Sequence, residues 1–154
     1  HIAGVTARPT SAWVTQQARN VTAGLGGRIQ SLRFLLRDRD AKYTTAFDAV
    51  FEAEDIEILK SPPQAPKTNP HCERVIGSIR REVLDHTLIL SENHARHVLA
   101  EYQRHFNEHR PHQGRGQLPA TRQEQPAPAN GRDARRLLGT QILGGVINEY
   151  RYAA

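Results

Sequence analysis

Short apolar runs alternate with helical patterns along most of this chain. Leu32–Arg37 is an apolar run typical of a short buried strand, and Ile56–Leu59 is a second one. Between them, Thr44 or Thr45 is expected to cap a short helix through Phe47, Val50 and Phe51, whose spacing suits one buried face. Strands that alternate with helices in this way predict an α/β fold.

Further elements follow from capping residues and prolines. The prolines of residues 61–70 predict a loop, and residues 125–131 have the composition of a linker. Pro111 is expected to stop a long helix that Ser91 opens. The same reasoning predicts a strand at His1–Val5 and a terminal strand or hairpin at Ile142–Ile147. It also predicts helices at about 12–23, from Asn69 or Pro70 to His86, and at 91–110.

Asp38 directly follows the first apolar run, where open α/β sheets place their site residues. Asp40 lies on the same face if the strand continues, so it competes for the same role. A second interpretation is a solvated turn in which the charges of Arg37-Asp38-Arg39-Asp40 pair with one another. The residues alone leave this choice open.

Glu73 lies just past the proline-rich loop, at the start of a helical pattern. Asn69, Glu73 and Arg80 fall on one helix face, where they could supply an amide, a carboxylate and a cation to a metal and phosphate site. The alternative is an ordinary solvent-facing stripe. Thirty-four residues separate Asp38 from Glu73, and carboxylates on a strand tip and a following helix can converge on one divalent metal.

Histidine and cysteine give weaker signals. His105, His109 and His112 suggest a zinc-like cluster, but no cysteine or acid with suitable spacing completes it, so a helix-surface or capping role is favoured. Cys72 is expected to be a small buried residue. A single cysteine excludes an intrachain disulfide and fits a reducing cytosol.

Charge is distributed unevenly along the chain. The net charge is +5 and the isoelectric point is near 9.9. Residues 1–37 contain five arginines and no acid, whereas the remainder is balanced. This pattern favours a polyanionic partner such as DNA, and no apolar run approaches a membrane span. Methionine is absent and the chain opens within an expected strand, which predicts an N-terminally truncated fragment; a processed or trimmed terminus is the alternative.

Taken together, three segments resemble the catalytic core of DDE integrases and transposases, in the insertion-sequence group related to retroviral integrase. They are Phe34–Thr44, then Ser61–Pro63 through Lys67–Arg74, then Tyr102–Asn107 followed by Arg110-Pro111-His112. The resemblance covers residues 1–122, as the C-terminal part of such a core. Residues 123–154 would be a linker and a C-terminal tail.

The resemblance implies an RNase H-like, retroviral integrase-like core that is incomplete at its N-terminus and lacks the first strands of the sheet. Asp38 matches the second catalytic aspartate of the family and Glu73 its catalytic glutamate, which favours Asp38 over Asp40. The family's first aspartate has no counterpart, because no Asp or Glu precedes Asp38.

The implied function is DNA integration or transposition by metal-dependent strand cleavage and strand transfer. Three carboxylates would hold two Mg²⁺ or Mn²⁺ ions about 3.5–4 Å apart, one activating water or a 3′-hydroxyl and the other stabilising the leaving oxygen. The partners would be element ends and target DNA, bound by a cytoplasmic homo-oligomer. DNA contacts are expected from Lys42, Lys67, Asn69, Arg74, Arg80 and Arg81.

Lacking one carboxylate, this chain is expected to have little or no activity by itself. A non-catalytic remnant that binds DNA, or a full-length transposase, through the basic N-terminal helix is the first alternative. An RNase H-like nuclease that acts by hydrolysis alone is the second.

Overall fold

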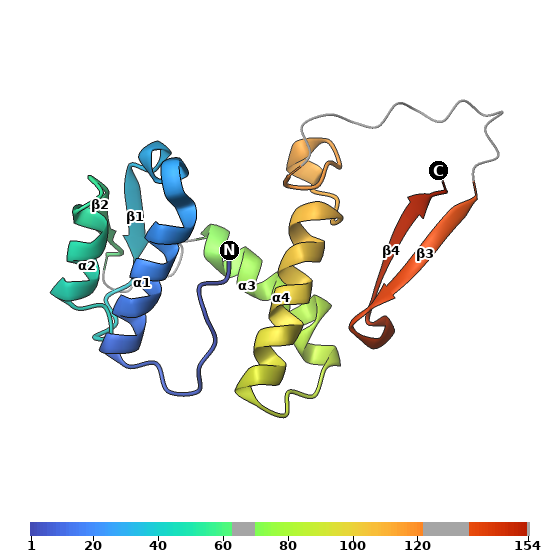
Figure 1. Cartoon of the computed structure of the whole chain (residues 1–154), viewed down its shortest axis with the longest axis horizontal. Coiled ribbons are helices and arrows are strands. Elements are labelled where there is room, and N and C mark those ends of the chain that lie inside the picture. The colour runs from blue at the N-terminus through green and yellow to red at the C-terminus, as the bar shows by residue number, and fades with distance from the viewer. Residues whose placement is uncertain (63–69, 122–135, 154) are drawn as a thin grey trace. The chain divides into compact units, whose positions relative to one another are not determined.

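The computed structural model describes residues 1–62, 70–121 and 136–153, and the chain divides into two compact units (Figure 1). The N-terminal unit comprises Ala3–Ile76, and the C-terminal unit comprises Gly77–Ala154 together with His1–Ile2. Each unit has its own cluster of buried hydrophobic side chains, which is the packing that a compact domain needs.

The N-terminal unit is a strand–helix–strand arrangement preceded by a longer helix. Its two strands pair in parallel, with Phe34 opposite Glu57 and Arg37 opposite Lys60. A parallel pair requires a crossover, and the short second helix provides it. The elements are α1 (Ser11–Leu25), β1 (Phe34–Arg37), α2 (Thr45–Glu52) and β2 (Glu57–Lys60).

Helix α1 begins and ends where its capping residues dictate. The Thr10 hydroxyl accepts a hydrogen bond from the Trp13 N–H at 3.2 Å, which satisfies one of the unpaired donors of the first turn. Gly26 follows the last helical residue with φ +51°, a conformation that glycine adopts without a steric penalty. The predicted helix is therefore confirmed, with one residue more at its start and two more at its end.

The core of this unit comes mainly from its helices. Strand β1 was expected to be buried, but it is only partly so: Phe34 is 56% exposed, Leu35 and Leu36 are half-buried, and Arg37 is the one buried residue of the strand. The reason is that β1 has a single pairing partner among the described residues and contributes little to the buried cluster. That cluster consists of Val14, Ala18, Ile29, Phe47, Phe51 and Ile56.

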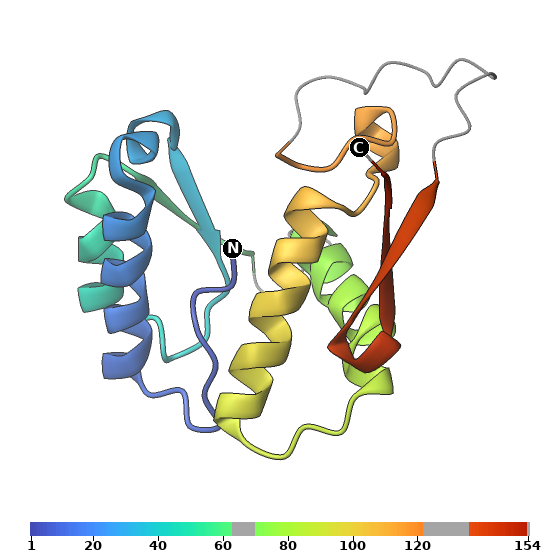
Figure 2. The same ribbon diagram turned by 45° about the vertical axis from the view of Figure 1, so that its right-hand side comes forward.

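The C-terminal unit packs two helices and a hairpin around a small apolar cluster. Helix α4 begins at the Ser91 cap, whose hydroxyl accepts from the His94 N–H at 3.1 Å. Val83, Val98 and Tyr102 are buried, and Leu143 and Ile147 of the hairpin region pack against them. Figure 2 shows the hairpin in red beside the two helices. The elements are α3 (Pro70–Glu82), whose first turns belong to the N-terminal unit, α4 (Glu92–Glu108), β3 (Leu137–Ile142) and β4 (Ile147–Tyr152).

The C-terminal tail forms an antiparallel hairpin, so the hairpin alternative is correct and the single strand is wrong. Residues 142–147, where the apolar residues and glycines suggested the structured element, contain the connection, and the strands extend on both sides of it. Gly144 and Gly145 have φ values of +66° and +91°, which explains why glycines occupy this turn.

Two further expectations are wrong. Residues 1–5 form no strand; instead the Ile2 N–H donates to the Gln103 Oε1 of α4 at 2.5 Å. Cys72 is exposed rather than buried, as is every other residue from Pro70 to Ile76. The apolar stripe of α3 becomes buried only in its last turn, toward Val83.

The expected loop at 61–70 and the expected linker at 125–131 fall largely outside the described residues. Within the described ranges, no helix is long and apolar enough to cross a membrane.

Candidate functional site

Asp38 lies directly after β1, at the edge of the sheet where the carboxyl ends of both parallel strands meet. Ser61, which follows β2, donates its N–H and its hydroxyl to the Arg37 carbonyl oxygen at 2.9 and 3.2 Å. Asp38 is exposed, and its Oδ1 accepts a hydrogen bond from the Asp40 N–H at 3.1 Å. Its other carboxylate oxygen has no hydrogen-bond partner in the part of the chain that the structure describes.

Asp40 is engaged by Lys42 through both of its carboxylate oxygens. Oδ1 accepts from the Lys42 N–H at 2.9 Å, and Oδ2 lies 2.5 Å from the Lys42 ammonium. The hydrogen bond from this ammonium is the largest cause of the lowered pKa of Asp40. Of the two competing aspartates, Asp38 thus retains an oxygen for a ligand, while Asp40 stabilises the turn.

Arg37 is a buried cation beneath this turn. It is 8% exposed, and its Nε and one terminal nitrogen donate to the two oxygens of Asp48 in α2 at 2.7 and 2.6 Å. Its other terminal nitrogen donates to the Asp38 carbonyl oxygen at 2.9 Å. The hydrogen bonds from Arg37 lower the pKa of Asp48 despite the opposing effect of burial, and Lys60 adds to the lowering.

The Arg37–Asp48 pair was not expected from the sequence. The alternative interpretation of residues 37–40 as a self-paired turn is wrong in its partners, since Arg37 pairs with Asp48 and Arg39 donates to the Ser61 carbonyl oxygen at 2.9 Å. A signal was available: Asp48 adjoins Phe47 on the buried face of a helix, and a buried acid needs a cation beside it.

Glu73 lies in the first turn of α3, where the positive end of the helix dipole favours a carboxylate. It is exposed and forms no hydrogen bond or ion pair among the described residues. Arg74, Arg80 and Arg81 are exposed on the same helix, and at 100° per residue Arg80 falls on the side of Glu73, within about 20° around the helix axis. The Arg81 guanidinium lies close to Gly77, where a Cβ atom would come within 2.9 Å of it.

The structure does not join these residues into a closed site. No hydrogen bond or ion pair connects Asp38 with Glu73, and within residues 1–62, 70–121 and 136–153 no three His, Cys, Asp or Glu side chains could hold a metal ion together. Lys67 and Asn69 lie outside the described residues. Lys42 pairs with Asp40, so its ammonium already has an anionic partner.

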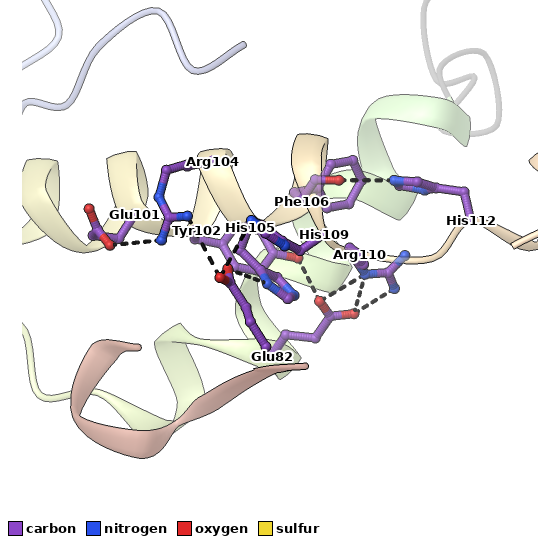
Figure 3. A network of polar contacts seen from close by, with 10 residues as sticks. Glu82, Glu101, Tyr102, Arg104, His105, Phe106, His109, Arg110 and His112 are labelled. Atoms are coloured by element: carbon purple, nitrogen blue, oxygen red, sulfur yellow. Dashed lines mark hydrogen bonds and ion pairs between the residues drawn. The ribbon is translucent and has the colours of Figure 1, made fainter. Parts of the chain in front are cut away.

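A second polar network explains the tyrosine and the Arg-Pro-His segment (Figure 3). The Glu82 carboxylate at the end of α3 accepts from the Tyr102 hydroxyl at 2.7 Å and from Arg110 at 2.6, 3.1 and 3.2 Å. Burial alone would raise the pKa of Glu82, but the hydrogen bonds from Arg110 and Tyr102 outweigh it and lower the pKa. The pKa of Tyr102 is raised, mainly by burial and secondly by the hydrogen bond to Glu82. These residues hold α3 against α4.

The histidines have structural partners, as the helix-surface and capping interpretation predicted. His105 Nδ1 lies 3.1 Å and His109 Nε2 3.5 Å from the Glu149 carboxylate of the hairpin. Arg104 is 3.7 Å from the same carboxylate. His112 Nε2 lies 3.0 Å from the Phe106 carbonyl oxygen, near the end of α4 (Figure 3). These contacts attach the hairpin to α4 and cap the helix.

Comparison with known proteins bears on the segment that contains Glu73 and the Glu82 network. Residues 54–119 match the family model described as integrase core domain. This segment, less than half of the chain, is therefore similar to an integrase core. An integrase core domain implies an RNase H-like fold, and the mixed α/β structure with small sheets is consistent with it.

One curated relative is a protein of an insertion element. The chain is 34% identical over 88 residues to an uncharacterised 39.2 kDa protein of insertion element IS476 from Xanthomonas euvesicatoria. The match covers 56% of this chain and 25% of the relative, so the chain spans about a quarter of that protein. No solved structure matches. The two matches support a core of the insertion-sequence transposase/integrase type.

Proposed function

We propose that this chain is part of an insertion-sequence transposase that cleaves DNA strands and joins them to target DNA. In this proposal Asp38 and Glu73 are the carboxylates that hold a divalent metal. The observation that carries it is the strand tip: Asp38 is exposed with one oxygen held by the Asp40 amide, while Asp40 has both oxygens on Lys42. Site residues of α/β sheets occupy this position.

The donor atoms fit Mg²⁺ or Mn²⁺ in kind, since both ions prefer carboxylate oxygens. Glu73 and one oxygen of Asp38 have no other partner among the residues that the structure describes. Bound metal would supply activation of a water or 3′-hydroxyl and stabilisation of the leaving oxygen. Two carboxylates hold such ions weakly, so the proposal includes a third from outside residues 1–154 and little activity from this chain alone.

Exposed arginines support the proposed DNA contacts. Arg74, Arg80 and Arg81 form no ion pair within the described ranges, so their guanidinium groups can meet phosphates without breaking internal bonds. Arg80 falls on the same side of α3 as Glu73, so a phosphate that it binds would lie on the side of the helix that carries the carboxylate. Replacing one phosphate-contacting arginine should reduce the slope of log K against log salt by about 0.9 on duplex DNA. The proposal also includes Lys67 and Asn69, and assembly of several copies on DNA in the cytoplasm.

The decisive experiment measures Mg²⁺- and Mn²⁺-dependent nicking and joining of a labelled DNA duplex. The proteins compared are this chain and a version extended upstream, each with Asp38→Asn, Glu73→Gln or the matched control Asp40→Asn. Joined products from the extended protein, lost with Asp38→Asn and Glu73→Gln but retained with Asp40→Asn, would support the proposal. Joined products that persist in Asp38→Asn but are lost with Asp40→Asn would contradict the choice of Asp38 as ligand.

A non-catalytic DNA-binding role is the second candidate, because residues 1–37 contain five arginines and no acid. Arg8, Arg19, Arg28 and Arg33 are exposed, whereas Arg37 is buried and unavailable to DNA. Binding that persists in Asp38→Asn and Glu73→Gln, with no metal-dependent product from either version of the protein, would favour this role. Nicked but never joined products would instead favour a nuclease that acts by hydrolysis.

A further inference from the structure

We propose that Arg37 and Asp48 are positioning residues for the Asp38 carboxylate, fixing the direction from which it meets a divalent cation. The inference rests on the proposed function of Asp38 as a metal ligand. Neither residue is a ligand itself: both are buried, and their charges are satisfied by each other. Their effect would pass through the backbone of residue 38.

The planar guanidinium of Arg37 connects Asp48 to the backbone of Asp38. Its Nε and one terminal nitrogen donate to the two Asp48 oxygens at 2.7 and 2.6 Å, and its other terminal nitrogen donates to the Asp38 carbonyl oxygen at 2.9 Å. Two parallel bonds to one carboxylate fix the plane of the guanidinium, because the donors form a rigid fork. The third donor therefore reaches the residue 38 carbonyl from a fixed direction set by α2.

The other side of the turn is held independently. Ser61 donates twice to the Arg37 carbonyl oxygen, and Arg39 donates to the Ser61 carbonyl oxygen at 2.9 Å. The peptide units before and after Asp38 are thus both restrained. The Asp40 amide then holds the carboxylate itself through Oδ1 at 3.1 Å. A metal ligand supported in this way loses little orientational freedom when the ion binds.

An ordinary stabilising ion pair is the competing explanation, and it makes a different prediction. A pair that only holds α2 against β1 would lower stability when broken, without a local effect on the Asp38–Asp40 hydrogen bond. A positioning pair changes that bond even in variants that remain folded. The Asp40 amide is therefore the reporter that separates the two roles.

The experiment uses amide NMR of the whole chain with two readouts. The first is the hydrogen-exchange rate and chemical shift of the Asp40 amide without metal, and the second is Mn²⁺-induced broadening of signals at residues 38–42. The variants are Arg37→Lys, which keeps the charge but loses the fork, and Asp48→Asn. Asp48→Glu keeps the charge and tests rescue. Asp55→Asn is the matched control, since Asp55 is exposed with φ +58°, which asparagine tolerates.

The expected result is faster exchange at the Asp40 amide and at least about tenfold weaker Mn²⁺ binding in Arg37→Lys and Asp48→Asn, the range typical of supporting residues around metal ligands. Asp48→Glu should recover part of both, and Asp55→Asn should change neither. Removing one partner of a buried ion pair can unfold a small domain, so Arg37→Lys and Asp48→Glu decide the outcome if Asp48→Asn does not fold.

An unchanged Asp40 amide in folded Arg37→Lys would overturn the positioning role whatever the metal data show. Failure of the proposed function looks different: Mn²⁺ broadening would be absent both from the wild-type chain and from the version extended upstream, or would persist in Asp38→Asn. In that case the exchange data still decide whether Arg37 and Asp48 orient the Asp38 side chain. A changed Asp40 amide would then mean that the two residues position the turn but not a metal ligand.

Discussion

Replacing Tyr102 with phenylalanine isolates one hydrogen bond of the Glu82 network. Tyr102 is 1% exposed and donates its hydroxyl to Glu82 Oε2 at 2.7 Å. The substitution keeps the ring in the apolar cluster and leaves Glu82 paired with Arg110, so little else is lost. A hydrogen bond to a charged acceptor contributes about 1.5–3 kcal/mol, and we expect the free energy of unfolding to fall by that amount.

The assay is urea unfolding, monitored by circular dichroism, with Tyr150→Phe as the matched control. Tyr150 is 65% exposed on the hairpin, so the same substitution there should cost less than about 0.5 kcal/mol. Equal effects at the two positions would refute the reasoning, because they would mean that the Tyr102–Glu82 bond contributes no more than an exposed hydroxyl.

The same variant has a defined pH dependence. The folded-state pKa of Glu82 is below its ordinary value. Ionised Glu82 therefore contributes its full share of the folding stability at pH values above its ordinary pKa, and this contribution is lost as the pH falls through the lowered pKa. Protonated Glu82 is a weaker acceptor for the Tyr102 hydroxyl. The stability difference between the wild type and Tyr102→Phe should therefore shrink in acid. A difference that grows on acidification would contradict the assigned sign.

Three further predictions concern other contacts. Asp48→Asn should lower the free energy of unfolding by about 3 kcal/mol or more, measured by Trp13 fluorescence, because it leaves Arg37 buried and unpaired. Glu149→Gln should speed amide exchange in β3 and β4 on the order of tenfold by removing the charge that attaches the hairpin to α4; unchanged exchange would contradict this. Thr10→Ala should cost about 0.5–2 kcal/mol, whereas Thr22→Ala inside α1 should not destabilise.

Elements set by local chemistry could be predicted from the sequence. Thr10 and Ser91 cap helices because their hydroxyls satisfy amides three residues on, a relation visible in the sequence itself. The periodic spacing of Phe47 and Phe51 identified the buried face of α2, and both are buried. The two parallel strands were also placed to within two residues, because each ends where charged residues begin.

Features that depend on distant partners could not be predicted in this way. Composition made Cys72 and Phe34 good candidates for burial, but burial requires a covering element, and neither is covered. Residues 1–5 have strand-like composition, yet Ile2 finds its hydrogen-bond acceptor on Gln103, about a hundred residues away in the sequence. No local pattern encodes such a choice.

The strand tip shows why charged residues were the hardest to assign. Four alternating charges at residues 37–40 predicted either a self-paired turn or a ligand site, and without the family resemblance these residues could not decide between them. In the structure each charge has a distinct environment: Arg37 is buried against Asp48, Arg39 binds a carbonyl oxygen, and Asp40 is taken up by Lys42. Because Arg37 and Arg39 are engaged by other groups, neither forms an ion pair with the Asp38 carboxylate. That separation of partners is the physical basis for proposing Asp38, rather than Asp40, as a metal ligand.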